Sequence, residues 1–542
     1  MGRLRLWITS GLALLVILSG LVLSAENQAE PSILWVKTFD GGSSDEARGV
    51  AFDSMDNIIV TGWSIQGTPQ NFMTVKYDGS GNEIWNRTYG DGSLQSRSVA
   101  VDSLDNIIVA GYQFDGFADS FLTIKYDKNG DMLWNRTQGE EWQAEGVVVD
   151  SQDNVIVVGY YCPDMDAETG WDIEIVKMDG NGNEIWSKTY DDLAGEHAFD
   201  VAVDSKDSIL ITGSSYDGMT HNSIVIKYDK NGNLLWTSTF NGGYEDEGHS
   251  VAVDSMDNVI ATGFTSTTAN EYFLTIKYDA DGKGDWNKTQ RKELKDRAYG
   301  VAVDSKDNII ATGWSSDGTT KYLTTIEYDS GGNQLWTTSY KGSPEYGSLF
   351  EVRGYGVAVD SVDDIVLTGS SSSALGTPTD FFAMKLRAAG MPVFEVHDID
   401  VDGTIFHVAT ESNSTISDFQ FIKEDKKLLF NVTGSTGTNG FCNVTIPNQL
   451  LGGPFSVTFN GQPLDGLLTF DNGTHTWLRF DYLHSAHRIE ITGTTVIHEF
   501  PSTILLPLLA LVALVAMGLR KRSREKRIHK MSCCFKSAAC SA

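Results

Sequence analysis

The chain is poor in cysteine, proline and histidine, and acidic residues far outnumber basic ones. Five cysteines in 542 residues form neither a disulfide framework nor a zinc-ligand pattern. They are Cys162, Cys442, Cys533, Cys534 and Cys540. Eleven prolines and 54 glycines without a G-X-Y period exclude collagen. The formal net charge of −31 repels phosphate backbones, so we expect no nucleic-acid partner.

Familiar catalytic motifs are also missing. The sequence has no GxSxG, HExxH, P-loop or dinucleotide fingerprint, and its ten histidines form no metal-ligand pair at i, i+4 spacing. We therefore expect no cofactor and no metal centre. Hydrophobic residues make up 41% of the chain, which excludes a disordered polymer. A length of 542 residues exceeds one compact core and predicts several domains or a repeat array.

The N-terminus predicts export. Residues 1–25 begin with Arg3 and Arg5, continue with an apolar stretch from Trp7 to Leu23 and end in small residues, as a secretory signal does. An uncleaved N-terminal anchor is the alternative.

The C-terminal region predicts a membrane anchor. Residues 504–519 are apolar throughout and, with the four preceding residues, are long enough to cross a bilayer. Residues 520–542 follow as a basic tail, and basic residues stay on the cytoplasmic side. We predict a single-pass protein of the cell membrane with most of the chain outside. A buried core helix is the alternative reading of the apolar segment.

The exterior part is strongly acidic and rich in glycosylation motifs. The two ends contribute +2 and +7, so residues 26–519 carry a formal charge of −40. Seven N-x-S/T tripeptides without a central proline all fall in this part. They begin at Asn86, Asn135, Asn287, Asn413, Asn431, Asn443 and Asn472. We expect a glycoprotein.

A 14-residue motif recurs seven times between residues 35 and 390. It reads GVAFDSMDNIIVTG from Gly49 and returns from Ser98, Gly146, Asp200, Ser250, Gly300 and Gly356. Each copy indicates a strand, a DSxDN turn and a second strand. A third strand such as FLTIKYD and a fourth strand ending in tryptophan follow. Four short strands about every 50 residues are typical of a propeller blade.

The tryptophans predict how the array closes. Copies one to six end in Trp85, Trp134, Trp186, Trp236, Trp286 and Trp336. Copy seven has no such strand, whereas Trp35 precedes the first copy. The seven motif copies and the seven tryptophan strands match one to one if the N-terminal strand completes the last blade. Such closure removes the exposed edges of an open array. An open β-solenoid is the rival architecture.

The motifs VAVDSxDNIIVTG and KYDxxGNxxW, as in Lys227 to Trp236, carry a family resemblance. The chain resembles the SBBP-type seven-bladed propeller repeat proteins of prokaryotic surfaces. The resemblance implies a propeller scaffold at the cell surface and no common catalytic residues. DxxGNxxW is also similar to the blade motif of quinoprotein propellers, but residues 35–390 lack the adjacent cysteines of that family.

Residues 391–495 lose the repeat but keep short alternating strands separated by NG turns. They predict a β-sandwich of immunoglobulin-like architecture. Residues 496–503 are a linker to the membrane. The sandwich and the C-terminal signal resemble those of archaeal surface proteins. The predicted fold class is therefore all-β: a seven-bladed propeller over residues 26–390, a small sandwich over residues 391–495 and one C-terminal transmembrane helix.

The candidate binding site is a ring of polar residues three positions before each motif. It comprises Glu46, Gln95, Gln143, His197, Glu247, Arg297 and Arg353. The strand register places this ring near the mouth of the central channel, with Trp142, His249 and Asp296 nearby. The alternative is an ordinary solvated loop.

Two other residue classes have competing interpretations. The tryptophans are either a sugar-stacking surface or packing anchors between sheets, and we favour anchors. Segments from Asp127 and Asp179 resemble the start of a calcium loop. Their twelfth positions are Gln138 and Tyr190, where an EF-hand needs glutamate, so we interpret them as capped turns.

The combined features favour a monomeric surface protein for binding or adhesion, with a glycan, protein or envelope partner. One alternative is an extracellular carbohydrate-active hydrolase or lyase at the channel mouth, for which His197 and Arg297 would be required. A structural envelope component is another. Glycan binding, substrate turnover and lattice formation distinguish the three.

Overall fold

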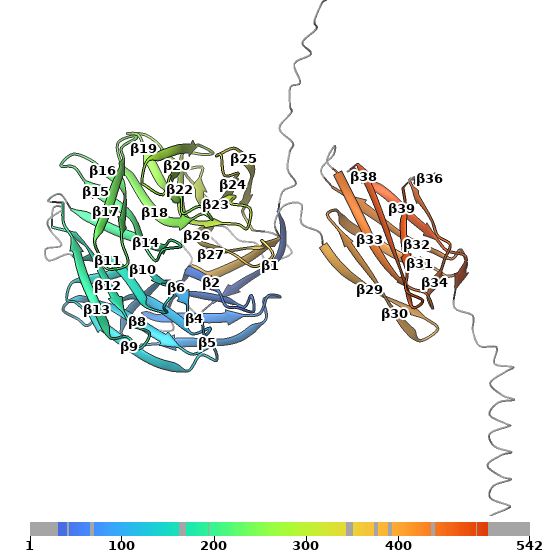
Figure 1. Ribbon diagram of the computed structural model, residues 1–542, viewed down its shortest axis with the longest axis horizontal. Coiled ribbons are helices and arrows are strands. Elements are labelled where there is room, and N and C mark those ends of the chain that lie inside the picture. The colour runs from blue at the N-terminus through green and yellow to red at the C-terminus, as the bar shows by residue number, and fades with distance from the viewer. Residues whose placement is uncertain are drawn as a thin grey trace, which may run out of the picture. The chain divides into compact units, whose positions relative to one another are not determined.

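A computed structural model describes residues 31–40, 43–65, 70–90, 92–161, 170–192, 195–342, 351–372, 378–387, 393–434, 439–464, 466–483 and 485–496. All regular secondary-structure elements in these ranges are β-strands, which confirms the predicted all-β class (Figure 1). Within the same ranges, none of the elements is a helix able to span a bilayer. The predicted signal (1–25), membrane helix (504–519) and basic tail (520–542) lie outside the described residues.

The chain forms two compact units, residues 1–390 and 391–542. The first unit consists of sets of four antiparallel strands. The first set contains β2 (Asp45–Phe52), β3 (Ile58–Ile65), β4 (Gln70–Tyr77) and β5 (Glu83–Tyr89), and the second contains β6 (Ser93–Val101), β7 (Ile107–Phe114), β8 (Asp119–Tyr126) and β9 (Met132–Gln138). The third contains β10 (Trp142–Val149), β11 (Val155–Tyr161), β12 (Asp172–Met178) and β13 (Glu184–Tyr190).

The next three sets continue the pattern. They are β14 (Glu196–Val203), β15 (Ile209–Tyr216), β16 (His221–Tyr228) and β17 (Leu234–Phe240); β18 (Asp246–Val253), β19 (Val259–Ser266), β20 (Glu271–Tyr278) and β21 (Gly284–Gln290); and β22 (Lys295–Val303), β23 (Ile309–Ser316), β24 (Lys321–Tyr328) and β25 (Gln334–Tyr340). One parallel pair, Glu271 with Lys295, links β20 to β22.

The last set joins distant parts of the chain. It contains β26 (Glu351–Val359), β27 (Ile365–Ser372), β28 (Asp380–Arg387) and the N-terminal β1 (Ser32–Phe39). β1 pairs antiparallel with β28, and Trp35 lies opposite Lys385. This pairing covers the edge of β28. It is the pairing that the positions of the tryptophans in the sequence predict.

Each repeated motif forms a hairpin because its first aspartate organises the turn. In the first copy, the Asp53 carboxylate accepts hydrogen bonds from the backbone N–H groups of Met55 and Asn57, both at 2.9 Å. Asp56 adopts a left-handed φ of 57°, which aspartate tolerates better than most residues. The β-branched runs on both sides then pair as β2 and β3.

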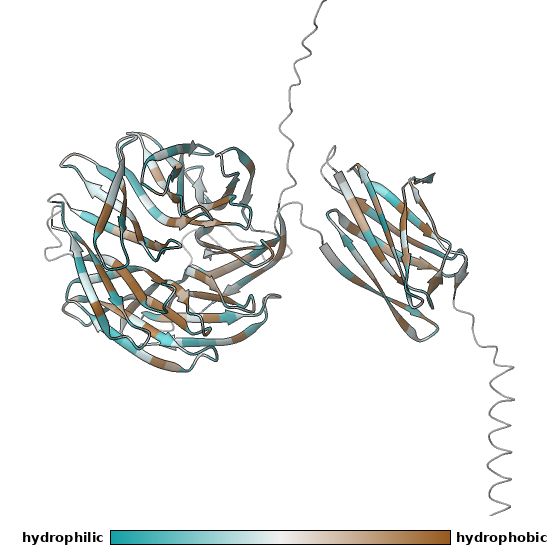
Figure 2. Cartoon of the chain, viewed as in Figure 1, coloured by the Kyte–Doolittle hydropathy of each residue, from teal (hydrophilic) through white to brown (hydrophobic). Residues whose placement is uncertain are grey.

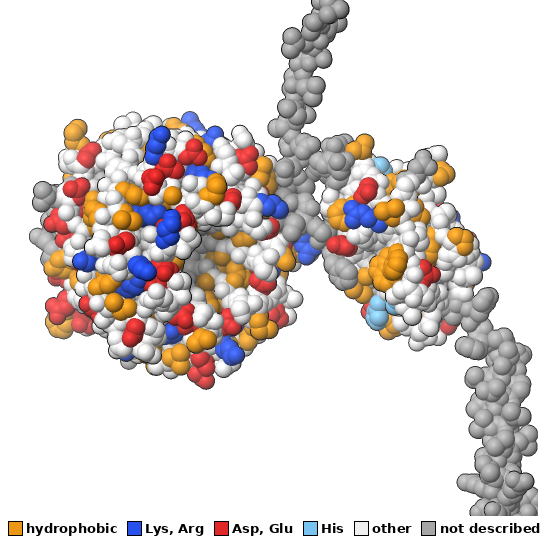
Figure 3. All heavy atoms as spheres, viewed as in Figure 1, with side chains coloured by type: hydrophobic (Ala, Val, Ile, Leu, Met, Phe, Trp, Pro, Cys, Tyr) orange, Lys and Arg blue, Asp and Glu red, His pale blue; other side chains and the backbone are white. Residues whose placement is uncertain are grey.

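The first strands of the sets contact one another in a closed order. β2, β6, β10, β14, β18, β22 and β26, here called the inner strands, each contact the next, and β26 contacts β2. Sheets placed around such a closed ring give this unit β-propeller character. The surface of the unit is hollowed near its centre, with charged side chains beside the hollow (Figure 3).

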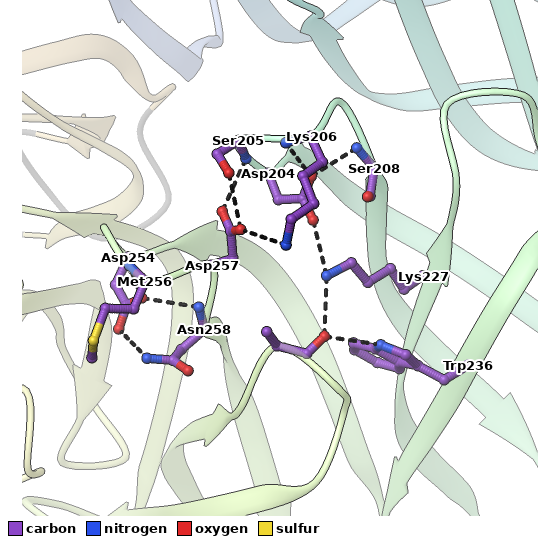
Figure 4. Close-up of polar contacts among 11 residues, drawn as sticks. Asp204, Ser205, Lys206, Ser208, Lys227, Trp236, Asp254, Met256, Asp257 and Asn258 are labelled. Carbon is purple, nitrogen blue, oxygen red and sulfur yellow. Dashed lines mark hydrogen bonds and ion pairs between the residues drawn. The ribbon is translucent and has the colours of Figure 1, made fainter.

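Serine and aspartate link neighbouring sheets around the whole unit. Ser205 in one motif donates its N–H and its hydroxyl to the Asp257 carboxylate of the next, at 3.0 and 2.9 Å (Figure 4). The same pair of hydrogen bonds occurs at every junction: Ser54–Asp105, Ser103–Asp153, Ser151–Asp207, Ser205–Asp257, Ser255–Asp307, Ser305–Asp363 and Ser361–Asp56. The last pair returns to the first motif.

Tryptophan and lysine side chains hold the outer parts of the sheets together. The Trp236 indole N–H and the Lys227 ammonium both donate to the Ala280 carbonyl in the next sheet, at 3.2 and 3.1 Å. Trp35 donates likewise to the Gly79 carbonyl and is 8% exposed. These indoles therefore act as packing anchors between sheets.

The second unit is a sandwich of two sheets. One contains β29 (Val393–Val401), β30 (Thr404–Ser412), β33 (Asn439–Pro447), β38 (His475–Leu483) and β37 (Leu468–Asp471). The other contains β31 (Thr415–Ile422), β32 (Lys427–Thr433), β39 (His487–Thr492), β35 (Ser456–Phe459) and β36 (Gln462–Pro463), and β34 (Leu451–Gly452) pairs with β40 (Thr495–Val496). Hydrophobic and hydrophilic residues alternate along these strands, and the buried set forms one core (Figure 2).

Candidate functional site

Every inner strand carries a β-bulge at the same place. In β2 the pairing with β3 shifts between Ala47 and Gly49, so Arg48 has no residue opposite it. A bulge re-aims the side chain of the extra residue. The seven bulged residues, here called the bulge ring, are Arg48, Arg97, Glu145, Phe199, His249, Tyr299 and Tyr355.

A glycine opposite each bulge makes it sterically feasible. A Cβ placed on Gly213 would lie 1.7 Å from the His197 carbonyl oxygen, so only glycine fits. The equivalent distance is 1.7 to 2.0 Å at Gly62, Gly111, Gly159, Gly213, Gly263, Gly313 and Gly369. These are the glycines that end the seven sequence motifs. The constant motif spacing therefore keeps the bulges in register around the axis.

The bulge ring surrounds a cavity of about 290 Å³, to which Tyr160 also contributes. A second cavity, of about 240 Å³, is lined by the same seven residues and by those that follow them along the inner strands. The bulge ring thus lies between two hollow stretches of the axis. We call the first of them the axial cavity.

One arc of the axial cavity is charged. An Arg48 guanidinium nitrogen lies 2.6 Å from a Glu46 carboxylate oxygen, and Arg97 Nε lies 3.5 Å from a Glu145 carboxylate oxygen. Burial raises the pKa of Glu145, while Arg97 opposes the rise. The Nε atom of Arg48 is buried without a hydrogen-bond acceptor in the protein. Such a buried donor is costly unless a ligand satisfies it.

The opposite arc is aromatic. Ring centroids of Phe199 and His249 are 4.9 Å apart, those of His249 and Tyr299 4.5 Å, and those of Tyr299 and Tyr355 5.5 Å. The Arg48 guanidinium lies 4.0 Å from the Tyr355 ring centroid and joins the two arcs. The axial cavity therefore offers guanidinium donors and a carboxylate on one side and flat apolar surfaces on the other.

The ring predicted from sequence occupies equivalent positions, two residues before the bulges. Each member pairs with the same position of the second strand, as Glu46 does with Trp63 and Arg353 with Ser370. All seven are spread around the inner strands at one level, but none lines the axial cavity. Glu46 and Glu247 instead support ring members, since Glu247 lies 3.2 Å from His249.

Three other predicted residues are engaged by neighbouring side chains. Gln95 donates to Gln70 at 3.3 Å, and Arg353 lies 2.9 Å from Glu351. The Gln143 amide accepts a hydrogen bond from the Tyr160 hydroxyl at 2.6 Å. Gln143 therefore orients a residue that lines the axial cavity.

His197 lies in an aromatic cluster. Its ring centroid is 3.8 Å from that of Trp171 and 4.8 Å from that of Tyr160. Burial lowers the pKa of His197 to about 3, so the ring is neutral at physiological pH. A neutral, enclosed imidazole packs well in this position and extends the aromatic wall from Phe199.

Glu247 and Arg297 line a separate cavity of about 490 Å³ beside β18 to β22. Arg297 Nε lies 2.6 Å from a Glu271 carboxylate oxygen, and its guanidinium lies 4.1 Å from the Phe264 ring centroid. Its charge is therefore already compensated within the protein.

Carboxylates that resemble metal ligands have partners in the protein. The Asp127 carboxylate accepts the N–H groups of Asn129 and Asp131 at 2.8 and 2.9 Å, as a turn cap does. Two groups bring three carboxylates within 4.8 Å: Asp40, Asp45 and Asp380, and Asp172, Asp191 and Glu196. Asp45 accepts the Ile65 N–H, and Glu196 accepts the Asp192 N–H.

Sequence reasoning missed most of the bulge ring, although it noted His249 as a neighbour. The ring predicted from sequence lies two residues before the bulge ring along the same strands, and its expected place at the channel mouth stays a prediction. The signal that indicates the bulge is the glycine nine residues after each motif aspartate, because a regular strand does not require it.

No protein family model matches this chain, and no curated protein matches it by sequence. Among solved structures it is similar to the polysaccharide lyase Uly1, at 8% identity and a TM-score of 0.44, over 66% of this chain and 99% of that one. Drosophila Semaphorin 1b, extracellular domains 1–2, matches at 9% identity and a TM-score of 0.42, over 66% and 88%. A gluconolactonase from Xanthomonas campestris matches at 12% and 0.34, over 66% and 98%. Similarities this low transfer neither a ligand nor an activity.

Proposed function

We propose that this chain is a single-pass cell-surface protein whose seven-bladed propeller, residues 26–390, binds an acidic glycan in the axial cavity. The signal-like segment, the apolar segment and the basic tail of the sequence support the membrane location. The seven motifs and the closed order of the inner strands support the blade number.

The observation that carries the ligand class is the pair of partly buried guanidinium groups of Arg48 and Arg97. Both line the axial cavity, and the Nε atom of Arg48 lacks an acceptor in the protein. A carboxylate or sulfate accepts charge-assisted hydrogen bonds from such donors. The aromatic arc suits the apolar face of a sugar ring, and Glu145 accepts bonds from its hydroxyl groups. One acidic sugar unit meets all three requirements.

Calorimetric titration of the full chain tests this proposal. Uronic-acid and sulfated oligosaccharides should bind at least about tenfold more tightly than neutral ones of equal length, since a charge-assisted bond is lost in the neutral ligands. Arg48→Gln should weaken acidic-glycan binding by about the same factor. Lys128→Gln removes an equal charge at an exposed turn and should leave the affinity unchanged.

Equal affinity for acidic and neutral glycans, or an Arg48→Gln variant that binds as the unmodified chain does, would contradict the proposed ligand class. Failure of every glycan to bind would contradict the function itself.

A lyase is the second candidate, because the axial cavity also holds groups for proton transfer. The imidazole of His249 and the phenol of Tyr299 are neighbours there, and burial raises the pKa of Tyr299. A guanidinium that neutralises a uronate beside such a pair favours proton abstraction and elimination. The bulge ring has one carboxylate, Glu145, whereas glycoside hydrolysis ordinarily uses two.

Product analysis after incubation with uronic-acid oligosaccharides separates binding from elimination. An unsaturated product that disappears in His249→Ala, with binding retained, supports the lyase. Unchanged oligosaccharides in the presence of measured binding exclude it and leave the binding function.

A further inference from the structure

The sandwich has an exposed apolar groove on the outer face of one sheet. Its volume is about 550 Å³, and its lining includes Glu411, Asn443, Leu468, Phe470, Trp477 and Arg479. Leu468 is 63% exposed and Phe470 66%. Exposed apolar side chains that gather in one groove are typical of an interaction surface.

Asn443 is one of the residues that line this groove. It belongs to β33, a central strand, and lies opposite Glu411 of β30 and Arg479 of β38. Cys442 and Val444, its neighbours along the strand, are fully buried in the core, so the Asn443 side chain faces outward. Its amide nitrogen donates to a Glu411 carboxylate oxygen at 2.8 Å.

The residues two positions away complete the arrangement. Phe441 and Thr445 lie on the same face as Asn443, because side chains alternate along a strand. Thr445 is the third residue of the Asn443 sequon and lies opposite Trp477. Trp477 and Phe470 have ring centroids 5.4 Å apart. The glycosylation motif is thus built into an aromatic surface.

We propose that Asn443 carries an N-linked glycan that lies in this groove and covers its aromatic residues. The apolar faces of the sugar rings contact Trp477 and Phe470, while their hydroxyl groups bond to Glu411 and Arg479. A glycan attached to a lining residue of the groove needs no separate partner to fill it. The proposal rests on the outside location and not on any ligand of the axial cavity.

The attachment uses a hydrogen that the fold leaves available. The Asn443 amide nitrogen has two hydrogens, and one bonds to Glu411. Replacement of the other forms the bond from nitrogen to sugar carbon C1, and the displaced proton passes to water. The donor is a glycosyl diphosphate, whose C1–O bond breaks as the diphosphate departs with the electron pair. The hydrogen bond to Glu411 persists in the product.

Asn431 provides a matched comparison. It also lies within a strand, β32, begins a sequon and donates its amide to a carboxylate, Asp418, at 2.7 Å. It belongs to the other sheet and does not line the groove. A glycan there should lack the aromatic contacts of the Asn443 glycan.

The first measurement is glycopeptide mass spectrometry on the full chain, secreted by a host that performs N-glycosylation. We expect a glycan on Asn443 and its loss in both Asn443→Gln and Thr445→Val, the second of which keeps the amide. An unmodified Asn443 overturns the proposal.

The second measurement is hydrogen exchange in β33 and β38 before and after enzymatic deglycosylation. We expect deglycosylation to speed exchange about fivefold, the effect of one aromatic contact. The increase should vanish in Trp477→Ala and persist in Asn431→Gln. A glycosylated chain whose exchange ignores deglycosylation, or responds equally in Trp477→Ala, shows that the glycan lies outside the groove and overturns the proposal.

Discussion

Glu327 breaks a pattern of buried ion pairs. In the other six sheets this position is a lysine whose ammonium lies 2.7 to 2.9 Å from the motif aspartate. In five of them the lysine also donates to a turn carbonyl of the next sheet. The sheet after Glu327 has no such turn, because β28 and β1 come from distant parts of the chain. A lysine there would lose that acceptor.

Glu327→Gln should stabilise the chain more at pH 8 than at pH 5. Burial raises the pKa of Glu327 to about 7, and the Asp304 carboxylate adds to the rise. A raised carboxyl pKa contributes stability below the unfolded value of about 4.5 and loses it as pH rises towards 7. Glutamine does not titrate, so the mutant advantage should grow by about 2 kcal/mol between these pH values.

Denaturant unfolding at both pH values measures this difference. Glu140→Gln, at an exposed loop position, serves as the control and should show no growth. An advantage of Glu327→Gln that is equal at pH 5 and pH 8 would show that Glu327 does not titrate in this interval.

Arg97→Leu should destabilise the chain by about 3 kcal/mol, because it leaves the buried Glu145 carboxylate without its cation. Adding Glu145→Gln should recover much of the loss, since the uncompensated charge is then removed. Thermal unfolding of both single variants and the double variant gives the coupling. Strict additivity of the two changes would argue against a functional ion pair at 3.5 Å.

At the level of the strand pair, glycine and bulge depend on each other. Gly213→Ala would place a Cβ 1.7 Å from the His197 carbonyl, so β14 and β15 must separate and Phe199 must move. We expect a loss of about 3 kcal/mol and weaker acidic-glycan binding, because one wall of the axial cavity shifts.

Thermal unfolding and glycan titration test the glycine together. Gly284→Ala in β21 is the matched control, since nothing lies within 4 Å of its added Cβ. If Gly213→Ala melts and binds as Gly284→Ala does, the bulge is not what shapes the axial cavity.

For the whole first unit, we expect the ring to open most easily at the junction of β1 with β28. β1 is held by strand pairing and by Trp35, whose indole reaches the next sheet. Trp35→Ala should cost about 3 kcal/mol and also release β1, which exposes the edge of β28. Trp134→Ala removes an equivalent indole that bonds to Gly180, but its strand is covalently tied on both sides.

Hydrogen exchange in β28 distinguishes the two tryptophan variants. We expect faster exchange there in Trp35→Ala and little change in Trp134→Ala. Equal protection of β28 in both would show that the β1 pairing persists without its indole.

Much of the fold follows from local sequence signals. The motif aspartates bond to N–H groups two and four residues ahead, so each hairpin turn is encoded within a few residues. The β-branched runs beside them predict strands for the same reason. The candidate site was less accessible, because the bulge at Arg48 and its counterparts shifts the register by one residue and changes which side chains face the axis.

Local chemistry therefore accounts for the β-strands and their hairpins, since each depends on residues close together in the chain. The axial cavity and the groove around Asn443 depend on side chains brought together from separate strands. Arg48 and Tyr355, for example, are in contact although about 300 residues separate them. Only the packing of the sheets determines such long-range contacts, because backbone bulges and strand order set the direction in which each side chain points.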